Sequence, residues 1–366
     1  RFPRLRPFAG GKATGAIYSG TSGSGKEFGT NDGQIAKFER CVKTENDPSA
    51  APAAVPPDLA ATYRPADRYA FLQAGGARLR YAWWNALRAP RGTVLILPGR
   101  VEFIEKYATE VVGDLLARGF AVVALDWRGQ GLSDRPLPDH DKGHIDHFET
   151  YLADLRLFLD TIVTPLAPRP ILALCHSMGG HLFLRSLALY GSAPIAAGVV
   201  TAPMTGLTQE ALLRTVLGLT PPLPSIDRCY LFGTGAFNPA RYPFRNNVLT
   251  HDERRFHFTA QWFAADPRLS LGGPTLGWSR QALRSMAAGL APGALEGIDL
   301  PLLLVSAAAD TLVNPASHGP VVARLRYGKL ATIAGARHEV MMETDAMRAA
   351  FWTAFDRFAQ KTCSAS

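Results

Sequence analysis

The five residues around Ser177 have the types and spacing best suited to chemistry. The segment CHSMG (175–179) follows a buried apolar run (171–176) and precedes an apolar helical pattern (178–190). It matches the pattern G-x-S-x-G with cysteine in the first glycine position, in which a sharp strand-to-helix turn exposes a serine hydroxyl. Small residues two before and two after the serine prevent collisions within that turn. The sequence therefore predicts that Ser177 is a nucleophile; the alternative is a serine that caps an ordinary helix.

A serine nucleophile needs a base, and the base needs an acid that orients it. Asp310 ends the apolar run 300–310, and His338 follows the run 329–336. Parallel strands place their carboxyl ends at one edge of a sheet, so both residues are expected beside the nucleophile. We predict Asp310 as the acid and His338 as the general base. Asp126 also ends an apolar run, but an acid that precedes the serine does not fit the order Ser…Asp…His.

Two backbone N–H groups must also face the oxyanion that forms during acyl transfer. One is the amide of Met178, directly after the nucleophile. The second is assigned to the amide of Arg100, in the loop after the apolar run 93–99. Two alternative roles are predicted for the Arg100 side chain: it binds an anionic head group, or it pairs with Glu102 or Glu105.

Five other histidines near these motifs are assigned no chemistry. His176 and His181 are too close to the serine along the chain to act on it as a base, and we expect them to pack in the interior. His140, His144 and His147 lie close together but lack neighbouring cysteines or an HExxH pattern. We expect them at a solvated helix entry.

Short apolar runs alternate with helical patterns along most of the chain, which predicts an α/β fold with a mostly parallel sheet flanked by helices. The expected strands are 93–99, 121–127, 171–176, 198–203, 300–310 and 329–336, and the expected helices are 102–118, 147–163, 178–190 and 343–359. Residues 204–290 break this rhythm and are rich in proline, glycine, arginine and aromatic residues. We predict a mainly helical cap there, inserted before the strand that carries Asp310, with the core formed by 58–203 and 291–361.

The first 57 residues differ from the rest. Residues 1–50 hold 8 of the 34 glycines, and APAAVPP (51–57) has the composition of an extended linker. We predict that residues 1–57 are a disordered or extraneous segment and a linker. The segment GTSGSGK (20–26) matches a phosphate-binding loop, but Glu27 stands where serine or threonine must hold magnesium, so no nucleotide site is expected.

Composition limits the classes of function. The 366 residues are 47% hydrophobic and 19% charged, and no apolar run approaches the ~20 residues that span a bilayer. The net charge of +8 is scattered rather than concentrated, which argues against a nucleic-acid partner but leaves open weak attraction to an anionic membrane surface. The four cysteines show no metal-binding or disulfide spacing. We predict a cytoplasmic protein without metal or cofactor, with peripheral contact at the inner face of the membrane left open.

These motifs resemble the branch of serine α/β-hydrolases that contains bacterial lysophospholipases and monoacylglycerol lipases. The segments that carry the resemblance are LPGRVEFIEKY (97–107), LDWRGQGLSDR (125–135), CHSMGGH (175–181), parts of 246–278, SAAADTLVNP (306–315) and GARHEVMMETD (335–345). It covers about residues 60 to 360. There are two departures: cysteine replaces glycine at Cys175, and Pro98 stands where many relatives have histidine.

The resemblance implies the triad Ser177, Asp310 and His338, and an oxyanion hole from the amides of Arg100 and Met178. It also implies a cofactor-free esterase that cleaves a single-chain lipid, a lysophospholipid, through an acyl-enzyme. A monoacylglycerol lipase, a general carboxylesterase and an acyltransferase with the same triad are the alternatives.

The cap carries more large apolar side chains than a solvent-facing insertion would, and we interpret the excess as an acyl-chain pocket. These residues are Leu212, Leu213, Leu217, Leu219, Leu223, Phe232, Phe237, Phe256, Phe258, Trp262, Phe263 and Trp278. Two cap arginines, Arg254 and Arg255, are assigned either to phosphate recognition or to a solvated surface.

Overall fold

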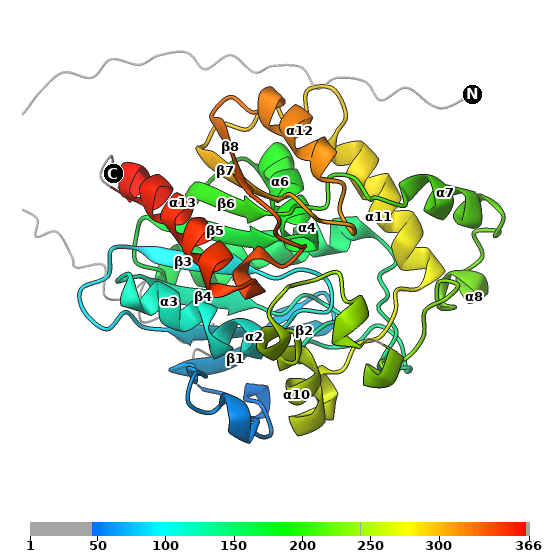
Figure 1. Ribbon diagram of the computed structural model, residues 1–366, viewed down its shortest axis with the longest axis horizontal. Coiled ribbons are helices and arrows are strands. Elements are labelled where there is room, and N and C mark those ends of the chain that lie inside the picture. The colour runs from blue at the N-terminus through cyan, green and yellow to red at the C-terminus, as the bar shows by residue number, and fades with distance from the viewer. Residues whose placement is uncertain (1–45, 242, 364–366) are drawn as a thin grey trace, which may run out of the picture. The chain divides into compact units, whose positions relative to one another are not determined.

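The structure is a computed structural model that describes residues 46–241 and 243–363 (Figure 1). The predictions for residues 1–45, including the segment 20–26, lie outside these residues. The chain divides into two units, Arg1–Lys43 and Thr44–Ser366, and the second unit contains every element described below.

The described strands form one eight-stranded sheet in the order β1-β2-β4-β3-β5-β6-β7-β8. The strands are β1 (Arg68–Ala74), β2 (Ala77–Trp84), β3 (Thr93–Leu97), β4 (Ala121–Leu125), β5 (Ile171–His176), β6 (Ile195–Thr201), β7 (Leu302–Ala307) and β8 (Gly328–Ile333). Pairing is antiparallel between β1 and β2 and between β2 and β4, and parallel from β4 through β8. The predicted fold class, an α/β-hydrolase fold with a mostly parallel sheet, is confirmed.

The first two strands were not among the expected ones. They form a hairpin around Gly75 and Gly76, whose φ angles of 52° and 83° favour glycine. The flanking residues Ala74 and Ala77 are directly paired. A two-glycine turn between runs rich in aromatic and apolar residues is a sequence signal for a hairpin.

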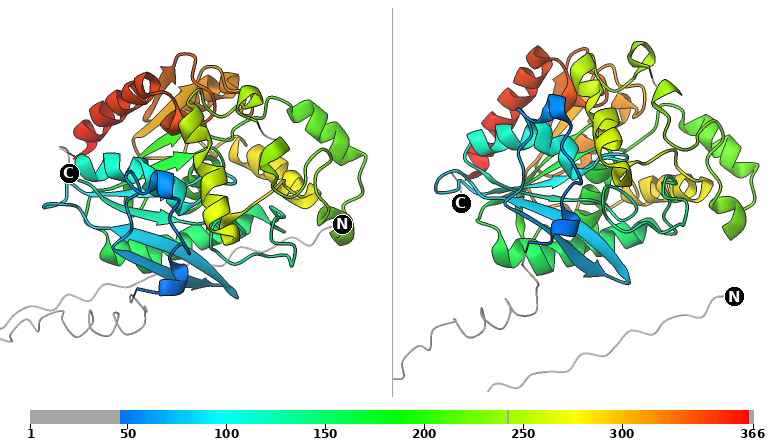
Figure 2. Two further views of the ribbon diagram at one scale, coloured as in Figure 1. Left: turned by 60° about the horizontal axis from the view of Figure 1, so that its bottom comes forward. Right: turned by 90° about the horizontal axis from the view of Figure 1, so that it is seen from below.

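Helices cover both faces of the sheet, as Figures 1 and 2 show. Helices α2 (Ile104–Thr109), α3 (Val111–Ala117) and α13 (Asp345–Cys363) contribute to one hydrophobic cluster with the sheet. Helices α4 (Phe148–Phe158) and α6 (Met178–Tyr190) pack against each other. Strands β3, β4 and β5 are buried along their whole length, because side chains from both faces are covered.

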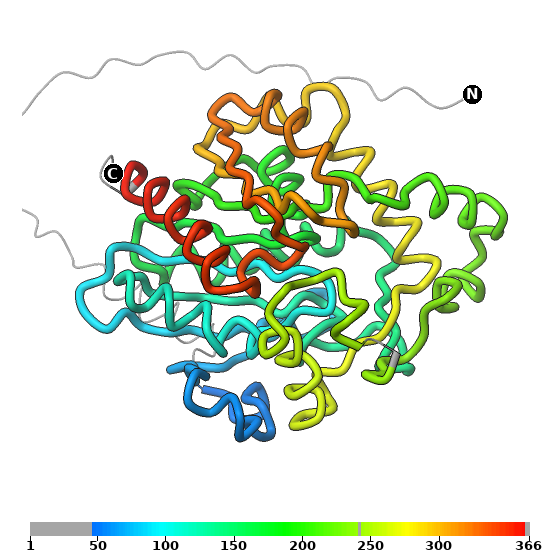
Figure 3. Tube along the Cα trace, viewed as in Figure 1, coloured from blue at the N-terminus to red at the C-terminus, as the bar shows by residue number. Residues whose placement is uncertain are grey.

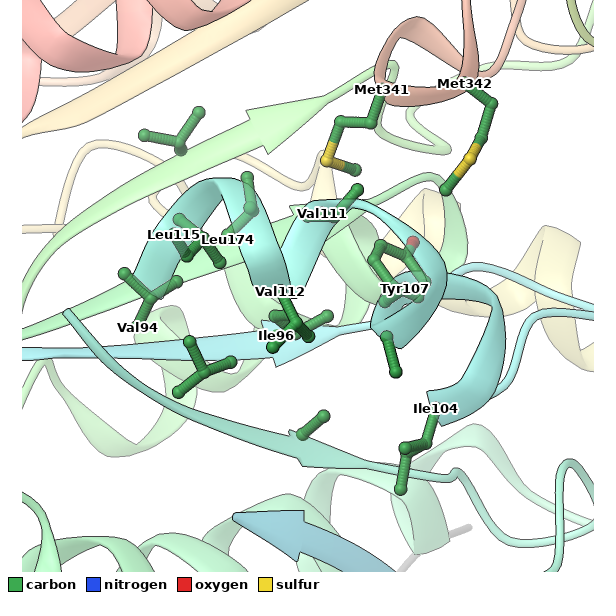
Figure 4. Packing of buried hydrophobic residues seen from close by; sticks show 14 of the residues in the cluster. Val94, Ile96, Ile104, Tyr107, Val111, Val112, Leu115, Leu174, Met341 and Met342 are labelled. Atoms are coloured by element: carbon green, nitrogen blue, oxygen red, sulfur yellow. The ribbon is translucent and has the colours of Figure 1, made fainter. Parts of the chain in front are cut away.

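Several shorter helical segments also belong to the core. After α4 the chain continues through a π-helical turn, η3 (Leu159–Val163), into α5 (Thr164–Leu166). Helix α12 (His318–Arg324) follows the short turn η7 (Pro315–Ser317) and packs on β8. The turn η8 (Val340–Met342) lies between β8 and α13. In Figure 4 its residues Met341 and Met342 point toward α2 and α3.

The chain leaves the sheet after β6 and returns at β7, as the trace in Figure 3 shows. The intervening cap contains α7 (Glu210–Gly218), α8 (Pro224–Asp227), η4 (Pro239–Arg241), η5 (Phe244–Asn246), α9 (Glu253–Phe256), α10 (Phe258–Ala265), η6 (Pro267–Leu269) and α11 (Leu276–Gly289). Phe258 and Trp262 of α10 are fully buried in the main hydrophobic cluster. In all views α7 and α8 lie at the edge of the molecule, away from the central sheet (Figures 1 and 2).

The predicted start of the folded core at residue 58 is too late, because residues 46–57 belong to it and include the turns η1 (Pro48–Ala50) and η2 (Pro57–Leu59). The Arg80 Nε donates to the carbonyl of Ala50 at 2.6 Å, and the amide of Ala53 donates to Asp266 of the cap at 2.8 Å. Ala50 itself is fully buried. These backbone contacts fix a segment whose composition is that of a linker.

Candidate active site

Ser177 lies in a sharp turn between β5 and α6. Its φ of 49° is in the left-handed region, which is unfavourable for a residue with a side chain and marks backbone strain. A Cβ atom at Gly179 would lie 2.2 Å from the carbonyl oxygen of Leu97, so only glycine fits there. Cys175 is fully buried, and burial raises the pKa of its thiol well above the ordinary value. The cysteine therefore fills the interior below the turn.

The structure brings Ser177, His338 and Asp310 into one hydrogen-bonded chain. The Nε2 of His338 lies 3.0 Å from the Oγ of Ser177, and its Nδ1 lies 2.6 Å from Oδ2 of Asp310. The other oxygen of Asp310, Oδ1, accepts from the backbone N–H groups of Leu312 (2.8 Å) and Val313 (3.1 Å). Residues that come from the ends of β5, β7 and β8 thus meet at one edge of the sheet.

The surroundings of Asp310 keep its carboxyl group ionised. Burial alone would raise its pKa, but the hydrogen bond and charge of His338 and the two backbone donors together lower that pKa below its ordinary value. An ionised Asp310 accepts the Nδ1–H of His338, which leaves the lone pair of Nε2 facing the Ser177 hydroxyl.

The loop that carries Arg100 is held on both sides of this residue. The N–H of Gly99 donates to Oε2 of Glu102 at 2.5 Å, and the N–H of Val101 donates to Oε1 of Gln130 at 2.6 Å. Val101 has a φ of 64°, so the chain turns sharply directly after Arg100. The other predicted donor, Met178, is the first residue of α6.

The Arg100 side chain contacts the cap. Its Nη2 donates to the carbonyl of Gly272 in the cap at 2.6 Å, and its guanidinium lies over the ring of Trp278 at 5.3 Å. A Cβ atom at Gly143 would lie 2.5 Å from the same Nη2. The residue therefore connects the loop after β3 to the cap.

His176 and His181 pack in the interior, as predicted. The Nδ1 of His176 lies 3.0 Å from Oγ1 of Thr201, and its ring lies 4.7 Å from the ring of His338. The Nε2 of His181 lies 2.7 Å from Oγ of Ser285. Burial lowers the pKa of His176 to about 4 and that of His181 to about 3, so both rings are neutral at physiological pH.

The alternative acid, Asp126, is part of a different cluster. Its Oδ2 lies 3.0 Å from the buried Arg80 guanidinium, which also pairs with Glu105, and its Oδ1 accepts from the N–H of Ile104 at 2.9 Å.

The expectation of solvated histidines is wrong for His144, because this residue is buried and contacts Thr275 of the cap at 2.8 Å. Within the described ranges no group of residues is arranged to hold a metal ion.

Sequence comparison identifies the family to which this chain belongs. The family model described as "Serine aminopeptidase, S33" matches residues 88–345, which include Ser177, Asp310, His338 and the whole cap. The chain belongs to the serine aminopeptidase S33 family. This confirms the resemblance to the serine α/β-hydrolases.

Two curated relatives of this S33 chain are named as a lysophospholipase and a probable lysophospholipase. Lysophospholipase L2 of Escherichia coli (strain K12) is 34% identical over 298 residues, which are 78% of this chain and 85% of that protein. The probable lysophospholipase L2 of Haemophilus influenzae is 28% identical over 263 residues, or 71% of this chain and 81% of that protein.

Solved structures share the fold. A soluble variant of monoglyceride lipase from Saccharomyces cerevisiae, in complex with a substrate analog, has a TM-score of 0.65 at 18% identity and covers 82% of this chain and 96% of its own. A carboxyl esterase from Bacillus coagulans has a TM-score of 0.60 at 17% identity and covers 82% of this chain and 100% of its own.

The two cap arginines of this S33 protein both pair with carboxylates; Arg255 is buried, whereas the side chain of Arg254 is 53% exposed. Arg254 pairs with Glu110, and the Nε of Arg255 lies 2.6 Å from Oε2 of the same residue. Arg255 also pairs with Asp252 (2.8 Å) and Asp345 (2.6 Å). We therefore do not assign a phosphate site to them.

Three buried charged residues, Glu102, Lys106 and Glu339, form a cluster beside the site that was not predicted; only Glu102 was considered, as a partner of Arg100. The available signal was a glutamate and a lysine four residues apart in a segment otherwise expected to form an apolar helix face. Nothing in the sequence indicated that Lys106 pairs with Glu339, which lies 233 positions further along the chain.

Proposed function

We propose that the protein is a serine hydrolase that cleaves the carboxylic ester of a lysophospholipid through an acyl-enzyme. The observation that carries the proposal is the hydrogen-bonded chain from Ser177 through His338 to Asp310, with distances of 3.0 Å and 2.6 Å. Nucleophile, base and orienting acid within hydrogen-bond reach are the requirement for this chemistry.

In the proposed mechanism, the Ser177 hydroxyl passes its proton to Nε2 of His338 while Oγ attacks the ester carbonyl carbon. Asp310 stabilises the imidazolium that forms. The amides of Arg100 and Met178 donate to the oxyanion of the tetrahedral intermediate. His338 then gives its proton to the departing alcohol, which leaves an ester between Ser177 and the acyl chain. A water molecule, deprotonated by His338, hydrolyses this ester and restores the serine.

The lipid substrate is supported by the relatives. The curated relatives are named lysophospholipases, and one structural neighbour is a monoglyceride lipase. Each buried methylene of an acyl chain contributes about 0.8 kcal/mol to binding, so an enzyme that acts on lipids is expected to favour long chains. Monoacylglycerol, with the same single chain and ester, is the alternative substrate.

The cap also supports peripheral contact with a lipid surface. Four large apolar side chains between α7 and residue 232 are strongly exposed: Leu212 (61%), Leu219 (81%), Leu223 (51%) and Phe232 (68%). Clustered exposed apolar residues are typical of surfaces that bind protein or membrane. Among the described residues no helix has the length and apolar character needed to cross a bilayer. From the four exposed apolar side chains we infer contact at the surface of the membrane.

Fatty acid release from C16 lysophospholipid in ¹⁸O-labelled water tests the reaction. The wild type is expected to release ¹⁸O-labelled fatty acid, and Ser177→Ala is expected to lose activity by roughly 10⁴-fold or more. If the acyl chain is instead transferred to an added alcohol, and no ¹⁸O-labelled fatty acid is released, the protein is an acyltransferase. Better turnover of short acetate esters than of C10–C16 lipids would refute the lipid substrate.

Co-sedimentation with anionic phospholipid vesicles tests the surface contact. The variant Leu219→Ser/Phe232→Ser is expected to sediment less than the wild type, because two exposed apolar groups are lost from the contact. Leu87→Ser is the matched control, since Leu87 is 77% exposed but lies outside the cap. Equal sedimentation of all three proteins would contradict the assignment of this surface.

A further inference from the structure

Lys106 lies between two buried carboxylates next to the active site. Its Nζ is 3.1 Å from Oε1 of Glu102 and 2.6 Å from Oε1 of Glu339. The three side chains are only 3%, 5% and 9% exposed, respectively. Burial of charged groups is costly even when they are paired, so the cluster is weak evidence for a contribution to stability. The proposed reaction uses none of the three side chains directly.

Each carboxylate belongs to a different loop of the site. Oε2 of Glu102 accepts from the N–H of Gly99 and from the hydroxyl of Tyr107, both at 2.5 Å. Glu102 thus holds the loop that carries Arg100. Glu339 directly follows His338, so its side chain holds the loop of the proposed base. The Lys106 ammonium joins these two loops across 233 residues of sequence.

Apolar packing brings the same elements together but does not fix their alignment. In Figure 4, Met341 and Met342 of η8 lie beside α2 and α3, near Tyr107 and Val111. All four residues belong to one buried cluster. Hydrophobic contact is non-directional, whereas two short ion pairs on one ammonium specify where each loop stands.

The charges of Glu102 and Lys106 are maintained in this interior. Burial alone would raise the pKa of Glu102, but Lys106, His176 and the hydrogen bonds from Tyr107 and Gly99 lower it to about 2. Burial alone would lower the pKa of Lys106, but its two carboxylate partners raise it above its ordinary value. Glu102 and Lys106 are therefore both charged at neutral pH.

We propose that Lys106 is a positioning residue, whose ammonium group bridges Glu102 and Glu339 and so fixes the oxyanion loop relative to the loop of the catalytic histidine. The inference rests on the proposed function, because that function assigns the Arg100 amide and His338 their roles. A displacement of one loop by about 1 Å would misalign the oxyanion donors and the base, which costs up to about 100-fold in rate.

The groups around His338 define the pH readout. They are Asp310 on its Nδ1, the His176 ring at 4.7 Å, and the buried His318, whose own pKa is lowered by burial and also by the charge of His338. Glu339 is its chain neighbour. Replacement of Glu339 by glutamine removes one negative charge near the base. The imidazolium is then less favoured, so the acid limb of the pH–rate profile moves to lower pH.

The test compares Lys106→Met, Lys106→Arg and Glu339→Gln with the wild type. The control is Lys329→Met, which removes a cation from an exposed position of β8. Lys106→Met is expected to lower kcat for C16 lysophospholipid and the rate of fluorophosphonate labelling by about 10- to 100-fold, with KM changed less than about threefold. Lys106→Arg is expected to regain most of this loss, because guanidinium can also bridge two carboxylates. Glu339→Gln is expected to move the acid limb by about half a unit to one unit.

The outcomes separate this inference from the proposed function. Absence of fluorophosphonate labelling in the wild type would refute the proposed function itself. Normal wild-type labelling together with a folded Lys106→Met variant that keeps kcat within about twofold would refute only the bridge. If Lys106→Met does not fold, the Glu339→Gln variant tests the bridge instead. A Glu339→Gln variant with the kcat and the pH–rate profile of the wild type would overturn the inference.

Discussion

The exchange Asp310→Asn tests the triad through the tautomer of His338. In the wild type, Oδ1 of Asp310 accepts from the amides of Leu312 and Val313, and Oδ2 faces Nδ1 of His338 at 2.6 Å. In the asparagine variant, the two backbone donors keep the amide oxygen at the Oδ1 position. The amide NH₂ group then takes the Oδ2 position and faces the ring. Nδ1 must therefore accept a hydrogen bond, and the ring proton moves to Nε2.

A proton on Nε2 blocks acceptance of the proton from Ser177, which lies 3.0 Å away. We expect kcat to fall by roughly 10⁴-fold, about 5.4 kcal/mol of transition-state stabilisation. The assay is steady-state hydrolysis of a p-nitrophenyl ester, with the melting temperature measured alongside to show that the fold is kept.

The matched control is Asp299→Asn, on the surface just before β7, where the side chain is 67% exposed and lies 3.4 Å from Arg326. This variant is expected to retain wild-type activity. A folded Asp310→Asn variant that loses less than about tenfold in kcat would refute the reasoning, because the wrong tautomer would not then be limiting.

Two further predictions concern stability. Burial lowers the pKa of His181 in the folded state to about 3. Between pH 6.5 and about 3, the unfolded chain therefore binds a proton that the folded chain does not. The free energy of unfolding consequently falls as the pH falls through this range. His181→Gln is expected to reduce the dependence of the free energy of unfolding on pH, measured by urea titration, by up to about 1.4 kcal/mol per pH unit. An unchanged dependence on pH would contradict this prediction. A chain that begins at residue 58 is expected to melt at least about 3 °C below one that begins at residue 46, because the buried Arg80 loses its acceptor on Ala50. Equal melting temperatures would show that the segment 46–57 does not contribute to the thermal stability of the fold.

The parallel core and the candidate site could be predicted because their signals are local. Strands β3, β4 and β5 are short apolar runs buried on both faces, and the turn around Ser177 needs glycine at position 179 for a steric reason visible in the motif. Asp310 and His338 follow from topology, since parallel strands end at one edge of the sheet.

What was missed depends on partners that are distant in sequence. Strand β2 contains the fully buried Arg80, whose charge interrupts the apolar pattern and whose partners Glu105 and Asp126 come from other elements. The segment 46–57 is fixed largely through backbone atoms, which leave no trace in residue type. His144 is buried and contacts Thr275 of the cap, a partner 131 positions further along the chain.

The most direct test of the central claim is the site of covalent labelling by a fluorophosphonate reagent, located by mass spectrometry of the full-length protein after digestion. Such reagents react with a serine that a neighbouring base has activated. We predict a single modification on Ser177 in the wild type, its absence in Ser177→Ala, and a strongly reduced rate in His338→Ala. An unlabelled wild type, or a Ser177→Ala variant that is still labelled and still hydrolyses lysophospholipid, would contradict the assignment of Ser177 as the nucleophile.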